Sequence, residues 1–304
     1  MYESVTLEIA YTRRVLLPYV WLSLAIVWLW LPPQAAARGL WSRFGVSAVW
    51  LTLAIAHAYA IGIVSVVGVV AIAVFGLLCY AHSRETPSPL NVLLALATIV
   101  LSLALMAHVV PGFSNTLIVR DAVLTPGAMP YTLFMNLDKG QIGLFLLAFG
   151  PPLIASRQDW MAMLTTAVPG ALALIVVLMA CALLIGQVRI EPKWPGFLPV
   201  WLWSNLLFTC AAEEALFRGV IQKHLQGRAP AGVSSRSIGG LIGAAIIFGA
   251  AHYAGGVWSV VLATIAGLGY GLVFWRTNRI EASILTHFLV NTAHILGVTY
   301  PALI

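Results

Sequence analysis

Three ionisable side chains stand close together in an otherwise apolar segment, Glu213-Glu214-Ala-Leu-Phe-Arg218. The chain is 61% hydrophobic and 9% charged, so this cluster is costly unless its members pair, line a wet cavity or react. Glu214 and Arg218 are four residues apart, so they share a helix face and can form an ion pair. Glu213 is rotated by about 100° from Glu214, and we expect it to lack a dedicated partner. Such a carboxylate holds its proton more tightly, as a general base and acid near neutral pH requires.

Two later apolar segments add polar groups of a second kind. Phe248-Gly-Ala-Ala-His252 places an imidazole near the end of one segment, and His287-Phe-Leu-Val-Asn291 places an imidazole and an amide on one helix face. A single buried histidine is usually a hydrogen-bonded core residue, and the acidic cluster alone also fits a salt-bridge network without chemistry. A convergent set of ionisable groups inside a membrane is a functional candidate by default.

The elements that must position these groups are membrane helices. A mean hydropathy of +0.96 over 304 residues, with apolar runs of about 20 residues, indicates a polytopic membrane protein. We therefore expect an all-α transmembrane bundle of about nine or ten spans with an intramembrane polar site. The apolar runs are 15–31, 46–60, 62–81, 90–110, 142–156, 165–187, 197–225, 238–256, 257–276 and 280–299.

The chain divides where the polar clusters begin. We assign 1–190 to N-terminal helices that provide packing, access or a partner surface, and 191–304 to a catalytic helical core. The stretch 111–141 is the longest hydrophilic one and suits a loop at the membrane interface. Lysine and arginine favour the loops at 31–45, 81–90, 156–164, 223–237 and 276–280 as cytoplasmic, whereas Arg13 and Arg14 favour the opposite orientation.

The three motifs, Glu-Glu-x-x-x-Arg, Phe-x-x-x-His and His-x-x-x-Asn in this order, resemble the CPBP family. This family comprises CAAX proteases and bacteriocin-processing enzymes, also called ABI or glutamic-type intramembrane proteases, and includes the type II CAAX prenyl endopeptidase. The resemblance covers residues 197–299. It implies that Glu213 activates water, that His252 orients the water, and that His287 and Asn291 hold the oxyanion. Glu214 and Arg218 would support them.

A metal centre is the alternative chemistry for the same residues. Glu213, His252 and His287 would supply three ligands to Zn²⁺ and leave a position for water. The chain lacks His-Glu-x-x-His, which would fix two ligands on one helical turn. We therefore expect that no cofactor is required.

The resemblance implies an intramembrane endopeptidase that cuts near the terminus of a membrane-delivered protein or peptide. CAAX tails, leader peptides and C-terminal sorting signals are the substrate classes it suggests. The alternatives are a non-enzymatic membrane partner or immunity protein with the same fold, and a proton-coupled transporter. Expected partners are membrane lipid and the substrate. The net charge of +6 fits loop topology and anionic headgroups rather than nucleic acid. The expected location is a bacterial-type inner membrane, with several spans.

Overall fold

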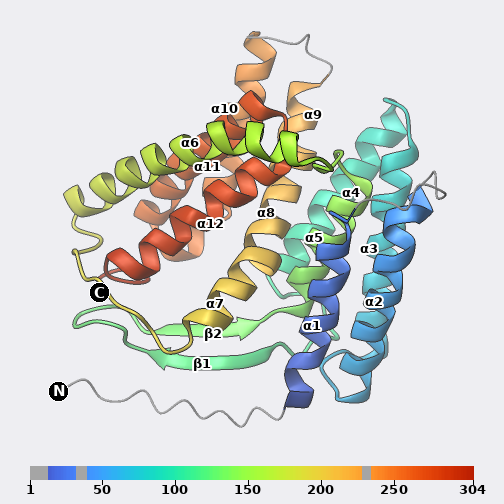
Figure 1. Ribbon diagram of the computed structural model, residues 1–304, viewed down its shortest axis with the longest axis horizontal. Helices are drawn as coiled ribbons and strands as arrows, with labels where there is room; N and C mark the ends of the chain where they lie inside the picture. The colour runs from blue at the N-terminus through green and yellow to red at the C-terminus, as the bar shows by residue number, and fades with distance from the viewer. Residues whose placement is uncertain (1–12, 32–39, 228–233) are drawn as a thin grey trace.

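The computed structural model describes residues 13–31, 40–227 and 234–304, and these residues form a helical bundle with one small sheet (Figure 1). Every apolar run named above contains helix. The helices of the N-terminal part are α1 Arg13–Trp28, α2 Leu40–Ala60, α3 Val66–Arg84, α4 Pro89–Met106, α5 Leu137–Phe149 and α6 Arg157–Leu184. Those of the C-terminal part are α7 Leu198–Ser204, α8 Ala211–Leu216, α9 Lys223–Gln226, α10 Ser235–Ala250, α11 Val257–Thr277 and α12 Ile280–Gly297.

The hydrophilic stretch 111–141 is more ordered than an interfacial loop. Strands β1, Thr116–Ala122, and β2, Tyr131–Met135, pair antiparallel with Thr116 opposite Met135 and Ala122 opposite Tyr131. The β-branched residues of β1 favour a pleated strand, and Gly127 supplies a positive φ of 76° between the strands. The hairpin extends across one end of the bundle (Figure 1), so this stretch forms a two-stranded sheet where a loop was expected, while the fold as a whole is mostly helical.

Four of the helices in the described ranges are long and apolar enough to cross a membrane, namely α3, α4, α6 and α11. Three more apolar helical segments are shorter, at Val15–Trp28, Phe44–Ala60 and Ser235–Ala250. The expected nine or ten spans therefore remain a prediction. The 197–225 run differs from an uninterrupted α-helix because two π-helical segments divide it.

These π-helical segments are η1, Asn205–Cys210, and η2, Phe217–Gln222, and they flank the short helix α8 that carries both glutamates. A π-helical turn bonds each amide to the fifth preceding carbonyl and occurs frequently at functional sites. The segments from α7 to α9 follow one another without a break in helical backbone. The acidic pair is thus held on a continuous helix with a widened turn on each side.

Helix α5 lies very close to this helix because two glycines face it. A Cβ on Gly140 would lie 2.8 Å from the ring of Phe208, and one on Gly143 would lie 3.1 Å from the backbone nitrogen of Ala212. Only a residue without a side chain permits this approach. The start of α5 is thereby brought beside α8.

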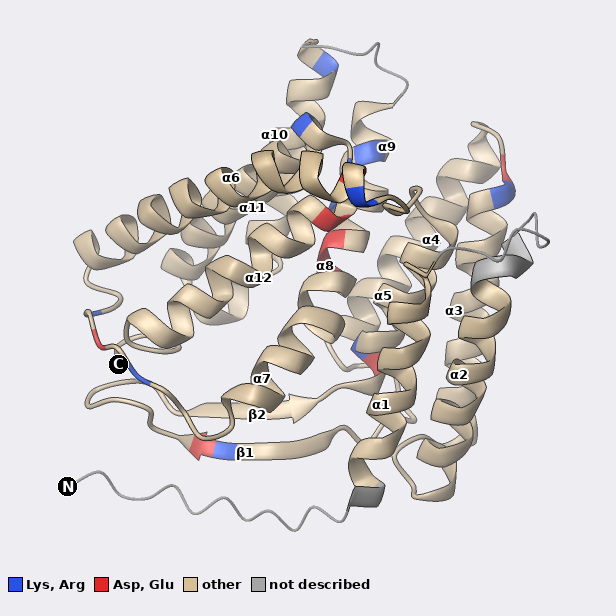
Figure 2. Ribbon diagram, viewed as in Figure 1, with Lys and Arg blue, Asp and Glu red and all other residues tan. Residues whose placement is uncertain are grey.

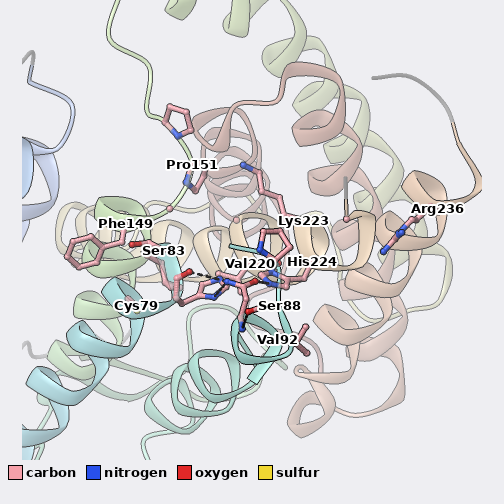
Figure 3. A pocket seen from close by; sticks show the side chains of 18 residues that line it. Cys79, Ser83, Ser88, Val92, Phe149, Pro151, Val220, Lys223, His224 and Arg236 are labelled. Atoms are coloured by element: carbon pink, nitrogen blue, oxygen red, sulfur yellow. Dashed lines mark hydrogen bonds between the residues drawn. The ribbon is translucent and has the colours of Figure 1, made fainter. Parts of the chain in front are cut away.

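Basic residues gather at the end of the bundle where α9, α10 and the α3–α4 connection meet (Figure 2). Arg279 of the α11–α12 connection bonds Asp159 at the start of α6, with Nη2 3.2 Å from Oδ1. A cavity of about 740 Å³ lies at the same end, between the ends of α3 and α5, the start of α4, and α9 (Figure 3). The connections 81–90, 156–164, 223–237 and 276–280 all lie at this end in their described parts, whereas 31–45 lies mostly outside the described residues.

Candidate active site

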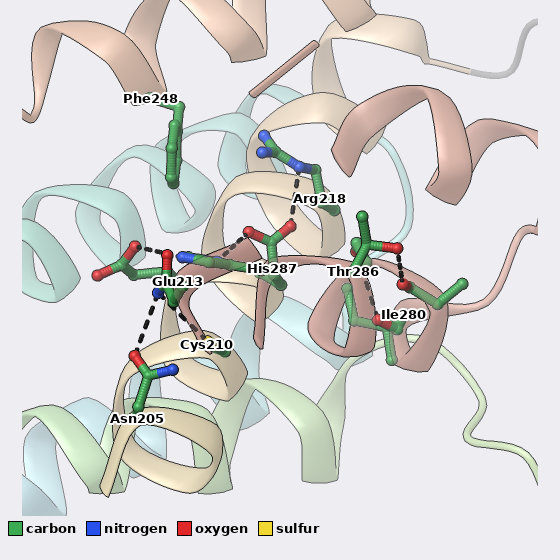
Figure 4. A network of polar contacts seen from close by, with 12 residues as sticks. Asn205, Cys210, Glu213, Arg218, Phe248, Ile280, Thr286 and His287 are labelled. Carbon is green, nitrogen blue, oxygen red and sulfur yellow. Dashed lines mark hydrogen bonds and ion pairs between the residues drawn. The ribbon is translucent and has the colours of Figure 1, made fainter. Parts of the chain in front are cut away.

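Glu214 stands at the centre of a fully buried ion-pair network. Its Oε2 lies 3.0 Å from Nε of Arg218, and both side chains have no exposed surface. Its Oε1 lies 2.9 Å from Nδ1 of His287. The ion pair predicted from the four-residue spacing is therefore present, and it also connects α8 to α12. Figure 4 shows Arg218 and His287 approaching from different helices.

The Arg218 guanidinium is further stabilised by two aromatic rings. Its central carbon lies 5.1 Å from the ring centroid of Phe248 and 5.8 Å from that of Tyr270. Tyr270 also stacks on His287, with ring centroids 4.6 Å apart and an interplanar angle of 16°. A cation against a ring face gains electrostatic energy, and more when water is absent. These rings fix the positions of Arg218 and His287 together.

Glu213 has a dedicated cation, contrary to the sequence expectation. Nζ of Lys139 lies 2.7 Å from Oε1 of Glu213, with 15% and 12% of the two side chains exposed. Oε2 of Glu213 lies 4.0 Å from Nε2 of His287. A cation at this distance favours the ionised carboxylate, which is the form that accepts a proton. Glu213 is therefore prepared as a base by Lys139 rather than by the lack of a partner.

Lys139 is the third residue of α5, and a polar cluster fixes the start of that helix. Nδ1 of His108 lies 2.7 Å from Oδ2 of the buried Asp138. Asn115 donates to the same oxygen at 3.2 Å and accepts from the backbone nitrogen of Leu137 at 3.2 Å. These contacts orient the first turn of α5, so they determine where Lys139 points.

His252 reaches the site because its helix ends early. Helix α10 stops at Ala250, and His252 precedes a single 3-10 turn, Tyr253–Gly255. Nδ1 of His252 lies 2.8 Å from the carbonyl oxygen of Phe248, so Nδ1 donates and Nε2 is left for the site. The ring is 4.7 Å from that of Phe248, which is in turn 5.9 Å from His287. His252 also lies within electrostatic range of Glu213.

Asn291 makes a contact that its motif does not predict. Its Nδ2 donates to Oδ1 of Asn205 at 3.1 Å and lies 3.9 Å from the sulfur of Cys210. Asn205 and Cys210 are the first and last residues of η1. The amide is thereby held against the π-helical turn that leads into α8, while His287 is held by Glu214. The two amide hydrogens of Asn291 are therefore directed at Asn205 and Cys210, and the sulfur is the weaker acceptor, which a better acceptor could replace.

The arrangement does not fit the three-ligand zinc set of Glu213, His252 and His287. Among the residues that the structure describes, no three histidine, cysteine, aspartate or glutamate side chains converge as metal ligands would. One oxygen of Glu213 already bonds an ammonium group, and Nδ1 of His287 bonds Glu214. We therefore derive no step through a metal.

Sequence reasoning missed Lys139, Asn205 and Tyr270 as members of this site. Lys139 had one available signal, because a buried Glu213 requires a cation and few lysines lie near apolar runs. Asn205 and Tyr270 had none, since one polar or aromatic residue in an apolar helix is usually a packing residue. The contacts that reveal them depend on the tertiary arrangement.

Comparison with known proteins supports the family resemblance. Residues 195–293 match the family model described as type II CAAX prenyl endopeptidase Rce1-like. No match was found among curated proteins, and none among solved structures. The matched segment begins just before α7 and ends within α12, so it contains all three motifs. The family resemblance predicted from those motifs is thus confirmed over residues 195–293, which match the Rce1-like family model.

Proposed function

We propose that this protein is an intramembrane endopeptidase of the CAAX type, in which Glu213 activates the water that attacks a peptide bond. The observation that carries the proposal is the pairing of Glu213 with Lys139 on one oxygen, with its other oxygen facing His287. A base must be ionised and have one oxygen free to accept a proton. The geometry provides both conditions beside two groups that can donate hydrogen bonds.

In the first step, Oε2 of Glu213 takes a proton from water as the water oxygen bonds the carbonyl carbon of the substrate. The carbonyl π electrons move to oxygen and create an oxyanion. His252 orients the water through Nε2, because its Nδ1 is used by the Phe248 carbonyl. Asn291 and His287 stabilise the oxyanion. His287 can do so through Nε2 only when that nitrogen carries a proton, since Nδ1 already bonds Glu214.

In the second step, the oxyanion re-forms the carbonyl and the carbon–nitrogen bond breaks. The proton held by Glu213 passes to the departing amine, which leaves the carboxylate ready for another cycle. Glu214 and Arg218 do not contact the reacting atoms in this scheme. They hold His287 in one orientation, and a positioned donor is worth more in a dry site than in water.

The proposed substrate is a protein or peptide whose cleavable end is delivered within the membrane. The supporting features are the apolar helices and the family match to CAAX prenyl endopeptidases. We propose a multi-pass location in a bacterial-type inner membrane. The alternative of a non-enzymatic partner has less support, because a scaffold does not require a base with one free oxygen.

The direct test uses purified protein in proteoliposomes with a panel of lipidated and unlipidated C-terminal peptides. Cleavage is followed by mass spectrometry in ¹⁸O-labelled water, comparing the wild type with Glu213→Gln. We expect one ¹⁸O atom in the new carboxylate and no product from the variant. Equal cleavage by a correctly folded Glu213→Gln protein would refute the proposed role of Glu213.

A further inference from the structure

The cavity of about 740 Å³ is separate from the candidate active site and has a distinct chemical character. Its basic and imidazole lining comes from the end of α3 and, far from it in sequence, from α9 and the start of α10. These groups are His82, Lys223, His224 and Arg236, and Figure 3 labels the last three. Glu213, His252, His287 and Asn291 do not line it.

The charge of this cavity is not neutralised by the protein. Among the described residues no aspartate or glutamate lines it, and the sequence from 215 to 280 contains none. Within the described ranges, no carboxylate lies within ion-pair distance of Lys223 or Arg236. The ammonium of Lys223 is half-buried and lies 5.8 Å from the ring of Phe274. Arg236 is more exposed than Lys223, and two cations without a counter-ion at one cavity attract an anion into the space between them.

Neutral hydrogen-bonding groups hold the imidazoles in place. Asn91 donates from Nδ2 to the carbonyl oxygen of His82 at 3.2 Å, and the same nitrogen lies 3.3 Å from Nδ1 of His82. Its Oδ1 lies 3.4 Å from Nε2 of His224, whose Nδ1 lies 3.1 Å from the carbonyl oxygen of Val220. The rings of His82 and His224 have centroids 5.0 Å apart. One asparagine thus joins α4 to both rings and preorganises the cavity wall.

The other wall of the cavity is apolar. Leu146, Phe149 and Pro151 line it. Phe149 also lines a neighbouring groove of about 570 Å³ between α2, α3 and α5, whose other lining residues are apolar except for Tyr80. A ligand with a charged head and a hydrocarbon tail would match both surfaces. The loop charges favour the cytoplasmic side for this end of the bundle, although Arg13 and Arg14 favour the opposite orientation, and anionic lipids are enriched on the cytoplasmic side.

We propose that this cavity binds a phosphate group, with Lys223 and Arg236 as its main charged contacts and Nε2 of His82 as a neighbouring donor, because both ring nitrogens of His224 already bond protein oxygens. Arginine and lysine are the side chains that most often bond phosphate oxygens. The adjoining groove favours a phosphate carried on a membrane lipid over free phosphate. The site does not depend on peptide cleavage, so it can be tested by binding alone.

The experiment measures binding to the full-length protein in detergent by native mass spectrometry. The probes are dihexanoyl phosphatidic acid, dihexanoyl glycerol without the phosphate, and inorganic phosphate. Lys223→Gln and Arg236→Gln are compared with Arg84→Gln, which removes an exposed charge from the same end but not from the cavity lining. Lys223→Arg keeps the charge and controls for misfolding.

We expect saturable binding of the phosphatidic acid and weak binding of the glycerol. Each cavity variant should lower the affinity by about tenfold, as expected for one charge-assisted hydrogen bond, whereas Arg84→Gln and Lys223→Arg should change it little. Competition by inorganic phosphate at similar concentrations would support the phosphate site and exclude the lipid source. Equal binding of the glycerol, an equal loss in Arg84→Gln, or displacement only by a peptide with a free carboxylate would overturn the proposal.

Discussion

The buried pair of Glu214 and Arg218 permits a quantitative test by a double-mutant cycle. Both side chains are fully buried, with 3.0 Å between Oε2 and Nε, so solvent screening does not reduce their interaction. Removing one partner of such a pair costs about 3–5 kcal/mol, because the other charge is left in a low-dielectric site. We expect this loss for Glu214→Gln and for Arg218→Met separately.

The double variant Glu214→Gln/Arg218→Met should be more stable than the sum of the single losses predicts. Neither charge is then uncompensated, and we expect a coupling energy of about 2–3 kcal/mol. Glutamine keeps an oxygen for Nδ1 of His287, so that hydrogen bond is preserved. Unfolding can be followed in mixed micelles by the fluorescence of the 11 tryptophans. Additive losses, within about 0.5 kcal/mol, would refute the interpretation that this pair acts as one unit.

Four further predictions concern the reaction itself. Glu213→Gln should abolish single-turnover cleavage while the unfolding midpoint stays near that of the wild type, because the amide cannot accept a proton; substantial turnover would contradict this. Lys139→Met should lower kcat/KM by at least about tenfold through loss of the cation beside Glu213, and Lys139→Arg should restore most of it; equal rates in both variants would exclude an electrostatic role. Asn291→Ala should lower kcat by about 10²–10³ with little change in KM, since an oxyanion donor acts on the transition state; a change confined to KM would argue for substrate binding instead. Chelation should leave cleavage unchanged, whereas stoichiometric zinc in the wild type that is lost in His287→Ala would establish a metal mechanism.

Sequence patterns predicted the features that depend on local spacing. The apolar runs identified the helices, and the four-residue interval identified the Glu214–Arg218 pair. Both follow from helical periodicity and from the cost of charge in an apolar helix. The same cost marks the three motifs as functional candidates, and the family match over 195–293 supports them.

Features that depend on tertiary contacts were not predictable in the same way. Lys139 is 74 residues from Glu213 in sequence, and their contact depends on how closely α5 approaches α8. The proline and glycine residues of 111–141 favour a loop, and in the sequence they outweigh the short β-branched run that forms the hairpin. Asn205 contacts Asn291 over 86 residues. A helical wheel drawn for one segment carries no information about such pairs.

The π-helical turns on either side of α8 also determine how this protein can be altered. Each residue of an α-helix turns the chain by about 100° and advances it by about 1.5 Å. Deleting one residue within η1 would let that turn close as an α-helix. The two glutamates would then rotate away from Lys139 and His287, although the segment would keep its apolar composition. Deleting one residue within η2 would leave the glutamates in place and rotate Lys223 and His224 out of the basic cavity instead. The η1 turn therefore sets the angular position of the glutamates and of the helix that follows them, whereas the η2 turn sets the angle between the glutamates and the residues of the basic cavity.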